Sequence, residues 1–149
     1  MKKSYALITG ATSGIGLEIS KDLAKRVFNL VLVARTKEII QEYNIKCDYF
    51  ASDLTLINSP EEIYQFTSKK LYSVDILVNN AGYALPNAFH INSMEDEEKC
   101  IRLLGTSVIA LTKKYINDMI SNGRGKIMIV SSVAAFAPAS ALQALYGPI

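Results

Sequence analysis

The sequence predicts an α/β fold, built as a doubly wound parallel sheet of about five strands. Short apolar runs alternate with stretches of helical spacing, which is typical of βαβ units joined by right-handed crossovers. The run Asn29–Ala34 is continuously apolar, as expected of a strand covered on both faces. A chain of 149 residues provides one hydrophobic core and not two. Residues 1–149 are therefore interpreted as a single domain.

The first half of the chain contains three of the predicted strands. A strand over Ser4–Thr9 is followed by a helix over Gly16–Val27, in which apolar residues recur between charged ones. The strand Asn29–Ala34 comes next. A short helix around Lys37–Tyr43 and a weaker strand over Lys46–Ala51 complete this half.

The second half contains two more strands and two helices. The helix over Pro60–Lys70 begins with proline, which suits the first helical turn. After the strand Val74–Asn79, a long helix covers Glu95–Ile120, and Ser93 is placed to cap its N-terminus. The last predicted strand is Lys126–Ser131.

Composition and charge exclude several classes of protein. Half of the residues are hydrophobic and the net charge is only +2, with lysines scattered along the chain, so neither disorder nor nucleic-acid binding is expected. No apolar run reaches the length of a membrane span, and no signal peptide is recognised. The spacing of Cys47 and Cys100 fits neither a metal site nor a redox motif. A cytoplasmic protein is the expectation.

The loop between the first strand and the first helix has the glycine pattern of a dinucleotide site. Gly10 allows a tight turn, Gly14 lets the backbone approach a pyrophosphate, and Gly16 lets the helix pack close to the sheet. The pyrophosphate then lies on the free N–H groups and the positive end of the helix. A plain glycine-rich turn is the alternative, and the surrounding strand–helix–strand order favours the dinucleotide site.

Three residues separate the first two glycines, and with the motifs that follow this pattern resembles the short-chain dehydrogenase/reductase family. Those motifs are Asp53-Leu54 after the third strand, Asn79-Asn80-Ala81-Gly82 at the end of the fourth, and Ser131-Ser132 and Tyr146 beyond the fifth. The resemblance covers the chain from Tyr5 to Tyr146. It implies a Rossmann-like fold and an oxidoreductase that interconverts a carbonyl and an alcohol by hydride transfer with NAD(P)(H).

The resemblance also implies roles for individual residues. Asp53 would hydrogen-bond the adenine amino group, although by itself it is equally a turn or cap residue. Ser132 would hydrogen-bond the substrate carbonyl and Tyr146 would be the acid/base. Thirteen residues separate these two, one more than is usual in the family, so Ser131 remains a second candidate. The predicted cofactor-binding residues are Gly10, Thr12, Ser13, Gly14, Ile15, Gly16, Arg35, Asp53, Leu54, Asn80, Ala81 and Gly82.

Arg35, directly after the second strand, bears on the choice of cofactor. A carboxylate at this point would bind the adenosine ribose hydroxyl of NAD(H). A guanidinium is suited instead to bidentate contact with a phosphate. The sequence therefore predicts NADP(H) rather than NAD(H), with Arg35 and Ser13 on the 2′-phosphate. The alternative is that Arg35 is simply solvated.

Two departures from the family pattern are visible. Leu104 stands where the family's long helix carries an asparagine that holds a relay water, and the chain ends at Ile149, where the lysine of the tyrosine motif would come next. We therefore expect a C-terminally truncated chain, without the family's later strands and helices and with little or no turnover. The fifth strand is then expected to be an open apolar edge.

Alternative functions and partners follow from the same observations. A non-catalytic dinucleotide-binding module or a degenerate family fragment would also fit the two departures. The expected partner is a small-molecule carbonyl or alcohol, which the sequence does not identify. By resemblance, a homodimer or homotetramer would form through the helix Glu95–Ile120, whose apolar residues lie on more than one face.

Overall fold

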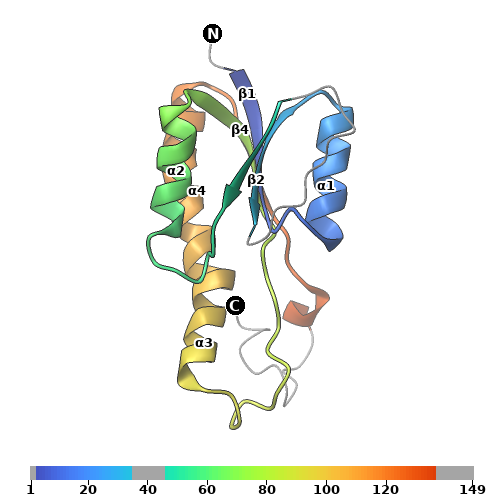
Figure 1. The fold of residues 1–149 in the computed structure, drawn as a ribbon, viewed down its shortest axis with the longest axis vertical. Helices are drawn as coiled ribbons and strands as arrows, with labels where there is room; N and C mark the ends of the chain where they lie inside the picture. The colour runs from blue at the N-terminus through green and yellow to red at the C-terminus, as the bar shows by residue number, and fades with distance from the viewer. Residues whose placement is uncertain (1–2, 35–45, 137–149) are drawn as a thin grey trace.

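Within the described part of the chain, five strands form one parallel sheet through the centre of the molecule (Figure 1). The computed structural model describes residues 3–34 and 46–136. The strands are β1 (Lys3–Thr9), β2 (Asn29–Ala34), β3 (Cys47–Ala51), β4 (Tyr72–Asn79) and β5 (Lys126–Ile129). Their order in space is β3-β2-β1-β4-β5, and every neighbouring pair is parallel. The predicted doubly wound parallel sheet is confirmed.

Helices cover both faces of this sheet. The helix α1 (Gly14–Lys25) lies on one face, and α2 (Ser59–Lys69) and α4 (Ser107–Ser121) lie on the other (Figure 1). A π-helical turn, Arg102–Thr106, joins α4 to α3 (Met94–Ile101), which extends past the end of the sheet. A short 3-10 turn, Val133–Phe136, follows β5.

The core consists of two apolar layers, one on each side of the sheet. Side chains alternate along β1, so that Tyr5 and Leu7 pack beneath α2 and α4 whereas Ala6 and Ile8 pack beneath α1. Strand β2 is buried from Leu30 onward because both of its faces are covered, as its continuous apolar run predicted.

The boundaries of several elements differ from the sequence-based expectation. The helix α1 begins at Gly14, two residues earlier than predicted, because the extended Ser13 already occupies the N-cap position. It ends before Val27, whose φ of 63° is left-handed and incompatible with a helix. Strand β5 ends at Ile129, although the Val130 N–H still donates to the Asn79 carbonyl. The predicted short helix over 37–43 lies outside the described residues.

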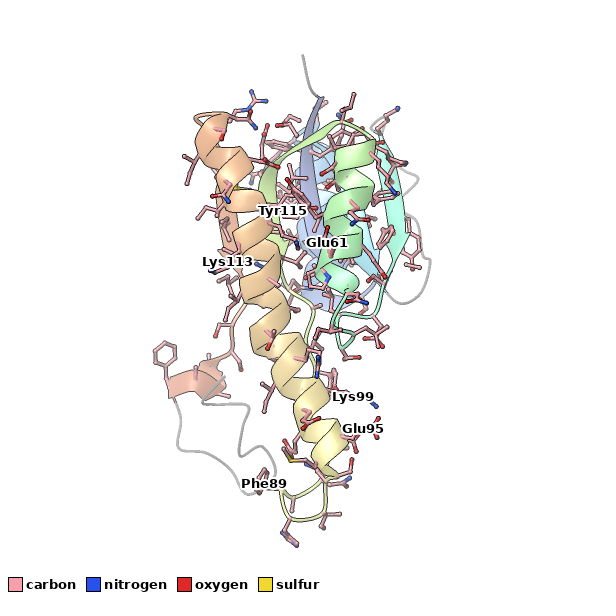
Figure 2. All side chains as sticks on the ribbon, turned by 90° about the vertical axis from the view of Figure 1, so that its left-hand side faces the viewer. Glu61, Phe89, Glu95, Lys99, Lys113 and Tyr115 are labelled. Carbon is pink, nitrogen blue, oxygen red and sulfur yellow. The ribbon has the colours of Figure 1, made fainter. Side chains whose placement is uncertain are left out.

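The long predicted helix is present, and its N-terminal cap is confirmed. The Ser93 hydroxyl accepts a hydrogen bond from the Asp96 N–H at 3.1 Å. The π turn inside the helix was not predicted. On α4, Tyr115 faces α2 (Figure 2), and its hydroxyl lies 2.9 Å from Thr67 Oγ1 in a buried contact. An ion pair between Lys114 and Glu61 also links α4 to α2. These contacts attach α4 to α2.

Strand β5 forms the apolar edge of the sheet that was expected. Among the residues that the structure describes, β5 pairs with β4 alone, and Met128 and Ile129 are 47% and 57% exposed. Every helix within residues 3–34 and 46–136 is too short or too polar to span a bilayer.

Candidate cofactor site at the carboxyl edge of the sheet

The strand order places a crevice between the carboxyl ends of β1 and β4. The chain leaves these adjacent strands toward opposite faces of the sheet, and ligands of doubly wound folds bind at such a switch point. A cavity of about 780 Å³ opens there. Predicted site residues that line it are Gly10, Thr12, Ser13, Gly14, Ile15, Asp53, Leu54, Asn80, Ala81, Gly82 and Ser131.

The glycine loop is shaped by close backbone packing. Gly10 has a φ of +64°, and a Cβ there would lie 2.9 Å from the Ala81 Cα. A Cβ on Gly16 would overlap the Gly10 carbonyl oxygen and the Asn80 amide, so that only glycine lets α1 pack this close to the sheet. Gly14 also has a positive φ, of +52°, but among residues 3–34 and 46–136 a Cβ there would meet nothing within 4 Å. At Gly14 the backbone therefore faces open space.

The N-terminus of α1 opens toward this space. Ser13 occupies the N-cap position, and its side chain makes no capping hydrogen bond. The N–H groups of the first helical turn carry partial positive charge and have no partner further back in the helix. With the exposed backbone at Gly14, they form a surface suited to an anion such as a pyrophosphate.

A hydrogen-bonded crosslink joins the ends of β1 and β4. The buried Thr9 hydroxyl accepts from the N–H groups of Asn80 and Ala81, at 2.9 and 3.0 Å. The Asn80 amide in turn donates to the carbonyls of Thr9 and Gly10, at 2.9 and 3.2 Å. Sequence reasoning assigned Asn80 to the cofactor and did not foresee this role or that of Thr9. A threonine that ends a strand gives no sign of which distant N–H groups it will meet.

On the β3 side, the cavity wall is polar. Asp53 Oδ1 accepts from the Thr55 N–H at 2.9 Å, so Asp53 does build a turn while also lining the cavity. Leu54 is 5% exposed and belongs to the core as well as to the wall. The hydroxyl of Ser52, another lining residue, is buried and has no partner within the described residues. Sequence analysis did not identify Ser52.

On the β4 side, the cavity wall is mostly apolar. It consists of Ala81, Gly82, Tyr83 and the two leucines of the π turn, Leu103 and Leu104. Burial, followed by the charges of Cys100, Asp96 and Asp53, raises the pKa of the Tyr83 phenol above its ordinary value. Tyr83 is therefore a neutral hydroxyl at physiological pH.

The predicted catalytic residues are only partly within the described structure. Ser131 lines the cavity, whereas Ser132 Oγ accepts from the Ala134 N–H at 3.2 Å in the turn after β5. Tyr146 and Arg35 lie outside the described residues. Gly16 lies behind the cavity wall and acts through packing.

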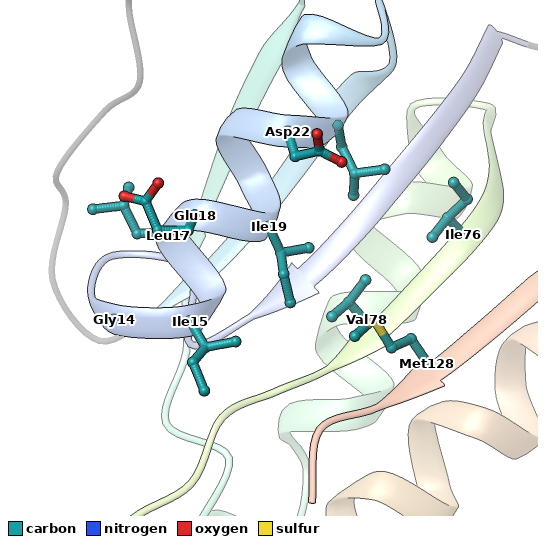
Figure 3. A pocket seen from close by; sticks show the side chains of 10 residues that line it. Gly14, Ile15, Leu17, Glu18, Ile19, Asp22, Ile76, Val78 and Met128 are labelled. Atoms are coloured by element: carbon teal, nitrogen blue, oxygen red, sulfur yellow. The ribbon is translucent and has the colours of Figure 1, made fainter.

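A second cavity, of about 770 Å³, lies along the side of α1 (Figure 3). Its lining is largely apolar, with Ile19, Val78 and Met128, and its charged members are the carboxylates of Glu18 and Asp22. Two carboxylates would repel phosphate groups. We therefore assign the candidate cofactor site to the first cavity, which has a helix N-terminus and backbone N–H groups.

Comparisons with known proteins agree with this fold. The chain is 33% identical to a fatty acyl-CoA reductase of Acinetobacter baylyi, over 97% of this chain and 52% of that protein. It superposes on a bulky-bulky ketone specific alcohol dehydrogenase of Comamonas testosteroni with a TM-score of 0.87 and 29% identity, covering 99% of this chain and 61% of that one. The chain thus spans about half the length of the curated relatives it matches.

A third relative was solved with a nucleotide. It is a short-chain dehydrogenase of Sphingobium yanoikuyae in complex with NADPH, with 29% identity and a TM-score of 0.86 over 99% of this chain and 59% of that one. The family model for short chain dehydrogenases matches residues 4–147. That match extends over nearly all of the sequence, and the chain therefore belongs to the short chain dehydrogenase family.

Proposed function

We propose that this chain is the dinucleotide-binding part of an oxidoreductase that interconverts a carbonyl and an alcohol with NADP(H). The observation that carries the proposal is the glycine loop. Backbone packing leaves no room for a side chain at Gly10 or Gly16, whereas Gly14 faces open space among the described residues at the N-terminus of α1. The positive φ of Gly14 favours glycine in its own right, and the open space leaves its backbone accessible to a ligand at the helix N-terminus.

The residues present fit a nicotinamide dinucleotide along the whole cavity. The N-terminus of α1 would hold the pyrophosphate. The polar β3 side, with Asp53 and the Ser52 hydroxyl that has no partner among the described residues, would hold the adenosine. The apolar β4 side, around Ala81 and Gly82, would hold the nicotinamide and its ribose. When bound, the nicotinamide supplies or accepts the hydride.

The chemical roles within this proposal belong to the residues beyond β4 and β5. Ser132 would donate a hydrogen bond to the substrate carbonyl, with Ser131 as its alternative, and Tyr146 would give or take the proton at the alcohol oxygen. In the pattern of the family a lysine four residues after the tyrosine would favour its ionised form, and that position lies outside the 149-residue polypeptide. For the 149-residue polypeptide we therefore propose binding with little turnover. The substrate class is a hydrophobic carbonyl or alcohol, since the sequence segments 79–90 and 134–145, which would line its pocket, are rich in apolar residues.

Relatives support NADP(H) over NAD(H), since the Sphingobium yanoikuyae enzyme was solved with NADPH. The test is calorimetric titration of the 149-residue chain with NADPH and NADH. We expect NADPH to bind at least about tenfold more tightly, which corresponds to roughly 1.4 kcal/mol. Arg35→Asp should reverse the preference. Arg26→Asp is the matched control, because Arg26 is an exposed arginine at the far end of α1. Tighter binding of NADH, or binding of neither nucleotide, would contradict the proposal.

A second candidate function is a non-catalytic dinucleotide-binding module. Leu104 favours it, because an apolar side chain occupies the cavity wall where a polar one would be needed to hold a water. This candidate predicts nucleotide binding with no oxidation of NADPH by any carbonyl, even when the chain carries the longer C-terminal region of its relatives.

A further inference from the structure

The π-helical turn Arg102–Thr106 joins α3 to α4 and lies beside the cavity. A π turn contains one more residue than an α turn, so it rotates the side chains that follow, and such turns often occur at functional sites. Leu103 and Leu104, both from this turn, line the cavity. Leu103 is 7% exposed and belongs to the core, whereas Leu104 is only partly buried and lies at the cavity surface.

Leu104 lies directly against Gly82. A Cβ added to Gly82 would lie 2.9 Å from Leu104 Cδ2. Within the described part of the chain, and apart from the two residues next to Gly82 in sequence, its one other neighbour within 4 Å would be the Asn80 carbonyl oxygen at 3.9 Å. The space that a side chain at position 82 would need is therefore occupied by a methyl group of Leu104. Together the two residues form a smooth apolar surface that continues the loop after β4.

The position of this surface determines which part of a ligand can reach it. In a doubly wound sheet the first nucleotide lies on the side of β2, the pyrophosphate crosses at the switch point, and the second nucleotide lies beyond it. Leu104 and Gly82 are beyond the switch point, on the β4 side. The adenosine half of a dinucleotide would not touch them.

We infer that Leu104, seated on Gly82, is the apolar wall against which the nicotinamide end of the dinucleotide packs. This inference rests on the proposed function and deepens it. Leu104 offers no hydrogen bond, so it acts by contact area and by excluding water from the nicotinamide. It thereby makes the chain favour a whole dinucleotide over an isolated adenosine nucleotide.

The test compares NADPH with adenosine 2′,5′-bisphosphate, which carries the adenosine half and no nicotinamide. Both are titrated by calorimetry into the 149-residue chain and its variants. Leu104→Ala should weaken NADPH binding roughly three- to tenfold and leave the bisphosphate within about twofold. Leu104→Met, which keeps a side chain of similar volume, should restore NADPH binding. Ile109→Ala is the matched control, because Ile109 is 60% exposed on α4.

A double-mutant cycle tests the contact itself. Gly82→Ala should weaken NADPH binding, because its methyl group pushes Leu104 toward the ligand. In the Leu104→Ala background the same change should have no further effect, since the obstructing methyl is gone. Independent, additive effects of the two changes would overturn the assigned contact.

The outcomes separate this inference from the proposed function. An equal loss for both ligands in Leu104→Ala, or no loss for either, overturns the role of Leu104 and leaves the cofactor proposal standing. Failure of the unmodified chain to bind either ligand overturns both. A nicotinamide-selective loss, rescued by methionine, supports the inference.

Discussion

Replacing Thr9 by valine should destabilise the protein and loosen the proposed nucleotide site. The two side chains have nearly the same shape, but valine cannot accept the hydrogen bonds from the N–H groups of Asn80 and Ala81. Thr9 is 1% exposed, so water cannot easily replace its hydroxyl. The change leaves two donors without their acceptor at the point where the loop after β4 is attached to β1.

The magnitude follows from these two donors. An N–H left unpaired in a buried position costs about 1–3 kcal/mol. Asn80 and Ala81 are themselves only partly buried, so we expect a combined loss of about 2–4 kcal/mol, in the lower part of the range for two such groups. For a chain of this size that corresponds to a fall in melting temperature of roughly 5–15 °C.

Urea and thermal unfolding, monitored by circular dichroism, measure this effect. Thr9→Ser is the control, because it retains the hydroxyl and should lose much less stability. NADPH affinity should also fall in Thr9→Val, since Ala81 and Gly82 line the cavity. A free energy of unfolding within about 0.5 kcal/mol of the unmodified chain would refute the argument, because that is the scatter of a neutral surface substitution.

Three further predictions concern other parts of the structure. Gly16→Ala should lose nucleotide binding and at least about 1–3 kcal/mol of stability, because its Cβ overlaps the Gly10 carbonyl; calorimetry and urea unfolding check this. Burial and the charge of Asp48 raise the pKa of the Cys47 thiol to about 11, from an ordinary value of 9.0. Cys47 should therefore react with iodoacetamide at pH 8 about 100-fold more slowly than a free cysteine. Because the Cys47 thiol has a higher pKa in the folded protein than in the unfolded chain, its contribution to the free energy of unfolding is fully present below pH 9 and should be lost as the pH rises from 9 to 11. Cys47→Ala should remove this part of the pH dependence of stability. Tyr115→Phe should cost only about 1 kcal/mol in urea unfolding, because Thr67 Oγ1 still donates to the Tyr64 carbonyl; a loss above about 3 kcal/mol would contradict this.

Local patterns were sufficient to predict the strands and the position of the glycine loop. A continuous apolar run such as Asn29–Ala34 has few ways to be buried except in the centre of a parallel sheet. The glycines Gly10, Gly14 and Gly16 form a pattern that can be recognised within a short segment between a strand and a helix, although the contacts that leave no room for a side chain at Gly10 and Gly16 come partly from Asn80 and Ala81. The Ser93 cap was predictable for the same reason, since its partner Asp96 lies only three residues away.

Contacts between distant segments could not be predicted from such patterns. The Thr9 crosslink joins residues 71 and 72 positions apart, and the register of β1 against β4 decides which N–H groups the hydroxyl meets. Ser131 lines the cavity, whereas the Ser132 hydroxyl accepts a hydrogen bond within its own turn. The point at which β5 ends determines this difference, because the two residues are of the same type. The π turn that brings Leu104 against Gly82 likewise depends on packing across the fold. The sequence by itself determined the strands and the position of the glycine loop, because their patterns are local. The tertiary structure decided which side chains face the cavity, because that depends on register and packing between segments far apart in the chain.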